Sequence, residues 1–232
     1  APLLLLAARL GQPLIVSTGM STLADIEAAL GVLAYGLTRE GEPSGRADTE
    51  AAFASEEGQA ALRAFVTLLH CVTQYPAPPE AVNLRAMGTM AAAFGLPVGY
   101  SDHTLGIEIS LAAVARGACV IEKHFTLDRA MPGPDHAASL VPTELAQLVA
   151  GIRRIEQALG SPRKQPAEAE FPNRAVARRS IVAARPIRAG EPLTADMLAV
   201  KRPGTGVSPL DWWDVLGRPA RRDYDADELI DR

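Results

Sequence analysis

Four short apolar runs, each followed by a loop and a helical stretch, are the feature that most constrains the fold of this chain. The runs are continuous rather than alternating: Pro13–Thr18, Phe65–Cys71, Pro97–Ser101 and Cys119–Phe125. Continuous runs of this kind are typical of parallel strands that are covered on both faces. The main helical stretches are Leu23–Leu33, Asn83–Phe94, Ile107–Ala115 and Thr143–Leu159. The pattern therefore predicts an α/β fold with a parallel sheet.

Four β/α units fit either half of a (β/α)8 TIM barrel or most of a small doubly wound sheet. Polar residues gather after the carboxyl ends of the runs, where barrel enzymes keep their chemistry. No glycine-rich dinucleotide turn follows any run, since Ser17-Thr18-Gly19-Met20 does not match it. A complete barrel takes about 250 residues. We therefore expect the last four β/α units of a barrel, and we interpret residues 1–10 as the tail of a helix in a longer protein.

A polar, proline-rich stretch after Gly160 predicts two domains. We expect the half-barrel over residues 1–160, a linker over 161–174 and a small β-rich module over 175–232. The module contains a strand near Ser180–Ala184 and a Gly/Pro-rich loop, Arg202–Gly206. The acidic segment 37–59 is expected to be a surface excursion with some helix, and no function is assigned to it.

The net charge of −4 disfavours a nucleic-acid binder or a binder of anionic membranes that relies on bulk charge. The two cysteines, Cys71 and Cys119, lie within apolar runs, which favours a reduced, cytoplasmic setting. No apolar run approaches the roughly 20 residues that span a bilayer.

The polar residues that carry most information are His103 and His124, each at the carboxyl end of a predicted strand. Because these strands are consecutive, the two imidazoles are expected at neighbouring positions on the rim of a barrel. Two neutral imidazoles with a carboxylate and open positions suit a catalytic divalent metal. The alternative is that both are structural histidines, and the residues alone leave the two readings open. His70 lies inside its strand, which favours a structural role.

Four further residues could bind a ligand, although each has an ordinary structural explanation. Ser17 precedes a helix and could meet a phosphate, but Ser-Thr-Gly also caps helices. Asp135 could accept hydrogen bonds from hydroxyl groups, but Pro-Asp turns are common on any surface. Tyr75 could form the wall of a pocket or simply end its loop. Arg202 could hold an anionic or carbonyl-bearing ligand, or remain solvated.

Six motifs, in this order and spacing, strongly resemble the sialic acid synthase family. They are Ser17–Met20, His70–Pro76, Gly99–Thr104, Glu122–Thr126, Pro132–Asp135 and Lys201–Gly206. The resemblance runs from Gly11 to the C-terminus, and the last module resembles the antifreeze-like (SAF) domain of that family.

The resemblance implies a barrel that condenses phosphoenolpyruvate with an N-acylated amino sugar, N-acetylmannosamine, to give N-acetylneuraminate and phosphate. His103 and His124 would hold Mn²⁺ or Mg²⁺ and form the catalytic group with Asp102. The remaining contacts that it implies are Ser17, Thr73 and Ser101 with phosphoenolpyruvate, and Tyr75, Asp135 and Arg202 with the sugar. Thr73 departs from the Ser or Asn of many members. A domain-swapped homodimer is also implied, in which the SAF domain covers the partner's site.

The sequence leaves three other functions open. The first is synthesis of N,N'-diacetyllegionaminate from 2,4-diacetamido-2,4,6-trideoxymannose. The second is a non-catalytic binding or assembly fragment. The third is a metal-dependent aldolase of another barrel family, which would release no phosphate from phosphoenolpyruvate. Because the family's first four β/α units are missing here, together with the lysines that grip phosphoenolpyruvate, we expect the isolated chain to be inactive.

Overall fold

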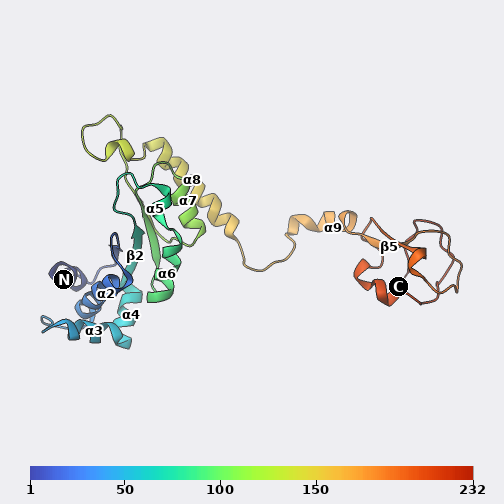
Figure 1. The fold of residues 1–232 in the computed structure, drawn as a ribbon, viewed down its shortest axis with the longest axis horizontal. Helices are drawn as coiled ribbons and strands as arrows, with labels where there is room; N and C mark the ends of the chain where they lie inside the picture. The colour runs from blue at the N-terminus through green and yellow to red at the C-terminus, as the bar shows by residue number, and fades with distance from the viewer. Residues whose placement is uncertain (232) are drawn as a thin grey trace. The chain divides into compact units, whose positions relative to one another are not determined.

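The computed structural model describes residues 1–231, which divide into two compact units, Ala1–Gly160 and the residues from Ser161 onward. Figure 1 shows the course of the chain through both.

A four-stranded parallel sheet forms the centre of the first unit. Its strands are β1 (Leu14–Ser17), β2 (Val66–Cys71), β3 (Val98–Asp102) and β4 (Ile121–Lys123), paired in sequence order. Strands β1, β2 and β4 lie within the predicted apolar runs, and β3 ends one residue beyond its run, at Asp102. The result is a curled half-barrel, as expected from the sequence.

Helices connect the strands and cover one face of the sheet (Figure 1). They are α2 (Leu23–Thr38), α5 (Pro79–Val82), α6 (Arg85–Phe94), α7 (Glu108–Ala115) and α8 (Pro142–Leu159). Helix α2 begins at a capping box, in which Thr22 and Asp25 bond each other's backbone N–H groups. Helix α8 has Pro142 in its first turn, where the missing N–H costs nothing.

The core of the first unit lies between the sheet and these helices. Because strand residues alternate between the two faces, Leu68 and Tyr100 point into this core and are fully buried. Ile15 and Ser17 of β1 point to the opposite, concave face, where Ile15 is 60% exposed. The concave face of the half-barrel is therefore open at β1.

The N-terminal residues and the acidic segment pack onto helix α2. Helix α1 (Pro2–Arg9) lies against it at Gly36, where an added Cβ would come within 2.7 Å of Ala8. The acidic segment forms α3 (Arg46–Ala54) and leads into α4 (Glu56–Phe65). Helix α3 meets α2 at Gly31, so the segment is a packed helical layer rather than a projecting loop.

Regular structure resumes before the predicted end of the linker. After residues 161–167, a 3-10 turn (η2, Glu168–Glu170) leads into helix α9 (Phe171–Ala177). Pro172 occupies the first turn of α9, a position that proline tolerates.

The second unit is a small β-rich module, as expected. Strands β5 (Ser180–Ala183) and β6 (Leu198–Lys201) are antiparallel. The remaining elements are η3 (Ala195–Met197), η4 (Pro209–Asp211) and helix α10 (Trp212–Val215). Its own core includes Ile181, Ile187 and Ile230.

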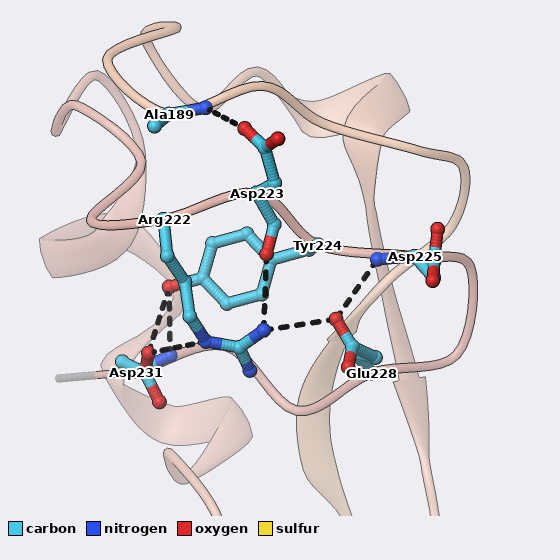
Figure 2. Close-up of polar contacts among 7 residues, drawn as sticks. All are labelled: Ala189, Arg222, Asp223, Tyr224, Asp225, Glu228 and Asp231. Atoms are coloured by element: carbon cyan, nitrogen blue, oxygen red, sulfur yellow. Dashed lines mark hydrogen bonds and ion pairs between the residues drawn. The ribbon is translucent and has the colours of Figure 1, made fainter.

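A polar network closes the C-terminal part of the second unit (Figure 2). The guanidinium of Arg222 lies 4.4 Å from the centre of the Tyr224 ring and pairs with Glu228 and Asp231, each at 3.0 Å. The buried Tyr224 exchanges hydrogen bonds with Asp231, and its burial raises the pKa of the phenol. These contacts fasten the C-terminal segment to the module.

Candidate active site

Two imidazoles meet at the carboxyl end of the parallel sheet. His103 directly follows β3 and His124 directly follows β4, so neighbouring strands place them side by side. Their ring centres are 5.3 Å apart and the rings are almost perpendicular. The neighbourhood expected from the sequence is therefore present.

The His103 ring is held by the loop that follows β2. Its Nδ1 lies 2.7 Å from the carbonyl oxygen of Val72. Because a carbonyl only accepts, Nδ1 carries a proton, and in the neutral ring the lone pair is then on Nε2. The carbonyl of His103 accepts a hydrogen bond from Ala77 N–H at 2.8 Å, so the same loop is fastened at a second point.

Tyr75 projects from this loop over both histidines. Its ring centre lies 4.1 Å from that of His103 and 5.5 Å from that of His124. Half of the Tyr75 surface remains exposed, so the side chain forms a wall that a ligand can reach.

Asp135 approaches the same rim from the loop after β4. Its carboxylate lies 3.9 Å from Nδ1 of His124. The loop is anchored by a 2.8 Å contact between His136 and Thr126, and by the Ser139 hydroxyl donating to the Asp135 carbonyl. A shallow cavity of about 370 Å³ lies here, lined by His124, Phe125, Pro134, Asp135, His136 and Ser139.

The concave face carries two of the three residues expected to contact phosphoenolpyruvate. The Ser17 hydroxyl lies 3.0 Å from the sulfur of Cys71. The buried Ser101 donates a 2.6 Å hydrogen bond to Glu122 on the adjacent strand. The third, Thr73, lies in the loop after β2 and packs so close to Gly19 that a Cβ there would collide with it.

Asp102 points away from the rim, into the layer between the sheet and helix α7. It is buried and accepts hydrogen bonds from Thr104 N–H (2.8 Å) and from the hydroxyls of Thr104 (2.7 Å) and Ser110 (2.5 Å). Lys123 completes its surroundings at 3.0 Å. Burial and the neighbouring Asp102 carboxylate raise the pKa of Tyr100, which stays a neutral donor beside it. The side chain expected to be catalytic is thus separated from the imidazoles by the strand.

The histidine pair is compatible with a divalent metal ion that keeps open positions. Within residues 1–231 no hydrogen bond engages His103 Nε2, and the opposite nitrogen has the carbonyl partner that metal-bound histidines usually have. Within residues 1–231 no group of three or more His, Cys, Asp or Glu side chains is arranged to hold a metal ion. Two imidazoles would supply only part of the coordination shell of such an ion, which leaves positions for other ligands such as water or substrate.

Two other residues singled out in the sequence lie elsewhere. His70 faces the helices, and its Nε2 lies 2.6 Å from the carbonyl of Val82, which is a structural contact. Arg202 belongs to the second unit, where it is exposed and its Nε donates to the carbonyl of Ala177 at 3.1 Å.

The residues that the sequence did not reveal are the ones that orient the site. The carbonyl of Val72 carries no side-chain signal at all. Lys123 could have been found from strand alternation, because it must point away from the face that Glu122 and His124 share.

Comparisons with known proteins give a consistent result. The NeuB family profile matches residues 1–164, and the SAF domain profile matches residues 178–231. An N,N'-diacetyllegionaminic acid synthase from Campylobacter jejuni is 46% identical over 229 residues, 99% of this chain and 62% of that protein. The N-acetylneuraminate-9-phosphate synthase of Homo sapiens is 36% identical over 231 residues, 99% of this chain and 57% of that protein. This chain thus spans about three-fifths of the length of these relatives.

A solved structure shares the fold. The N-acetylneuraminic acid (sialic acid) synthetase from Leptospira borgpetersenii, in complex with citrate, aligns with a TM-score of 0.59 and 35% identity. The alignment covers 74% of this chain and 51% of that one. In the described part of this chain, no helix combines the length and the apolar character needed to cross a membrane.

Proposed function

This chain belongs to the NeuB family, and from that premise we propose that it forms part of a nonulosonic acid synthase. The reaction joins phosphoenolpyruvate to the aldehyde carbon of an open-chain N-acylated amino sugar, consumes one water and releases phosphate. The single observation that carries the proposal is the pair His103 and His124 at the ends of adjacent strands. Their ring centres are 5.3 Å apart, and Tyr75 lies over both rings.

His103 and His124 are proposed to hold Mn²⁺ or Mg²⁺. Such an ion, when bound, supplies a Lewis acid that polarises the aldehyde oxygen. The chain's own contribution is orientation: the Val72 carbonyl engages Nδ1 of His103, which leaves Nε2 as the nitrogen that would bind the ion.

The proposed substrate contacts divide between the concave face and the rim. Phosphoenolpyruvate would accept hydrogen bonds from Ser17, Thr73 and Ser101. The Ser101 hydroxyl, which donates to Glu122 in this structure, would then donate to phosphoenolpyruvate instead. Tyr75 and Asp135 would contact the sugar. Arg202 of a partner subunit would reach its N-acyl group and close the site against water.

The sugar that we favour is 2,4-diacetamido-2,4,6-trideoxymannose, which gives N,N'-diacetyllegionaminate. The support is the 46% identity with the legionaminic acid synthase against 36% with the N-acetylneuraminate-9-phosphate synthase. N-acetylmannosamine is the second candidate, supported by the 35% identity with the sialic acid synthetase of Leptospira.

Phosphate release from phosphoenolpyruvate tests the proposal. The complete protein is incubated with Mn²⁺, phosphoenolpyruvate and each sugar in turn, and kcat/KM is measured from phosphate while mass spectrometry identifies the nine-carbon acid. Stoichiometric phosphate and acid, with the diacetamido sugar preferred, are expected. Absence of phosphate with every N-acylated amino sugar would overturn the synthase assignment in favour of an aldolase or a binding fragment.

A polypeptide of these 232 residues alone is proposed to be inactive. Its four-stranded sheet leaves the concave face open at β1, where Ile15 is 60% exposed, so water has access to the site. Full activity of this polypeptide in the same assay would contradict the proposal.

A further inference from the structure

An ion pair between Asp102 and Lys123 is buried directly behind the two histidines. The side chain of Asp102 is 0% exposed and that of Lys123 is 4% exposed, with 3.0 Å between Lys123 Nζ and the carboxylate. The lysine also donates a 2.7 Å hydrogen bond to the carbonyl of Thr104. No other ion pair described in residues 1–231 is buried on both sides.

The register of the sheet puts this pair one residue before the histidine pair. Asp102 on β3 is directly opposite Lys123 on β4, and Ser101 is directly opposite Glu122. Since consecutive residues point to opposite faces, the hydrogen bond of Ser101 with Glu122 and the Asp102–Lys123 ion pair clamp the two strands from opposite sides. The next residues along the chain are His103 and His124.

The partners of Asp102 extend the clamp to the helix layer and to the loop. The Ser110 hydroxyl comes from helix α7, and both the N–H and the hydroxyl of Thr104 come from the residue after His103. Lys123 binds the carbonyl of the same Thr104. The backbone on both sides of His103 is therefore fixed by one carboxylate and one ammonium group.

A buried ion pair is a poor device for stability alone, because removing both charges from water costs as much as their attraction returns. An apolar pair of similar volume would hold the strands together equally well. The charged pair adds conformational specificity, because each group has a fixed set of hydrogen-bond partners. These partners allow one strand register and one loop conformation.

We propose that Asp102 and Lys123 are positioning residues, which hold His103 and His124 at the separation and angle needed to bind a divalent cation. The inference rests on the proposed function, since it takes the two imidazoles as the metal ligands. It also gives Asp102 a role other than the direct catalytic one expected from the sequence.

Mn²⁺ affinity of the complete protein, measured by isothermal titration calorimetry alongside the thermal midpoint, tests this role. The decisive variant is the double substitution D102N/K123M, which removes both charges and leaves no unpaired ion to unfold the protein. We expect it to fold and to bind Mn²⁺ about 10–100-fold more weakly, as loss of an outer partner of a metal ligand does. The single variant Asp102→Asn is expected to lose affinity as well.

The control is Arg39→Gln, which removes the 2.7 Å surface ion pair with Glu57 at helices α2 and α4. This variant should retain the affinity of the parent protein. A D102N/K123M protein with unchanged Mn²⁺ affinity would overturn the positioning role, whatever its thermal midpoint. If the parent protein itself binds no Mn²⁺, the proposed metal site fails, and the positioning role fails with it.

Discussion

At the residue scale, what the site can bind depends on which ring nitrogen of each histidine carries a proton. The Nδ1 proton of His103 is engaged by the Val72 carbonyl, which leaves one lone pair on Nε2. A substitution at this position therefore removes one proposed ligand together with the Val72 contact, but leaves the hydrogen bond from Ala77 N–H to the His103 carbonyl in place.

His103→Ala is accordingly expected to weaken Mn²⁺ binding by at least the roughly 10–100-fold that loss of an outer partner causes, because a ligand itself is lost. Calorimetric titration of the complete protein measures this change. His70→Gln is the matched control, since His70 faces the helices and contacts the Val82 carbonyl. Its affinity should equal that of the parent protein, and an unchanged affinity in His103→Ala would rule out the metal assignment.

At the scale of single elements, strand β3 approaches its neighbours so closely that only glycine fits at one position. A Cβ on Gly99 would lie 2.5 Å from the Val120 carbonyl oxygen and 2.6 Å from a methyl group of Leu69. Gly88 on helix α6 has no such neighbour, because nothing lies within 4 Å of its added Cβ.

Gly99→Ala is therefore expected to destabilise the protein by about 1–3 kcal/mol through overpacking. Gly88→Ala should instead stabilise it by about 0.5–1 kcal/mol, because alanine is the better residue in a helix interior. Urea unfolding of both variants measures the pair of changes. Similar values for the two would show that β3 can shift to accommodate a methyl group.

The polar network of the second unit predicts a dependence of stability on pH. The Asp225 backbone N–H and then Arg222 lower the pKa of Glu228, and the Ala189 backbone N–H and then Arg188 lower the pKa of Asp223. A lowered pKa in the folded state contributes stability that is present above the unfolded value, near 4, and lost as pH falls through the folded value.

We therefore expect the thermal midpoint of the second unit to stay level from about pH 8 to 5 and to fall below about pH 4. Calorimetry at a series of pH values measures it. Glu228→Gln should weaken the fall at acidic pH. Asp225→Asn is the control, because within residues 1–231 the Asp225 carboxylate has no hydrogen bond or ion pair; identical curves for both variants would contradict the role of Glu228.

The elements of this fold were largely predictable, whereas the directions of side chains at their ends were not. Continuous apolar runs predicted β1 to β4, and the helical stretch Thr143–Leu159 predicted α8. Asp102 was expected to form the catalytic group with His103 and His124, but residues next to each other along a strand point to opposite faces. Alternation along β3 places it on the other face, with Lys123, and only the register between β3 and β4 shows that pairing.

At the scale of the whole molecule, the proposal of a domain-swapped homodimer makes each active site depend on two chains. His103 of one subunit and Arg202 of its partner would serve the same site. Two variants that are each inactive, His103→Ala and Arg202→Ala, would then complement each other when they are co-expressed.

In a mixed dimer, one site would carry both substitutions and the other would carry neither. Since about half of the dimers are mixed when expression is equal, about a quarter of the parent activity is expected. Phosphate release by the co-expressed, purified protein measures it. Each variant expressed alone serves as the control, and a lack of recovery would show that each subunit's Arg202 serves its own site.

The alternation of Asp102 with His103, and of Lys123 with His124, has a consequence for how the length of this region can vary. Inserting or deleting one residue within β3 or β4 would turn an imidazole into the helix layer and a charge into the concave face. A change in strand length before the histidines that keeps both faces in place is therefore a change of two residues. Insertions and deletions among related sequences should therefore be confined to the loops of this region. A relative with a single-residue insertion or deletion inside either strand is expected to lack the histidine pair at this site.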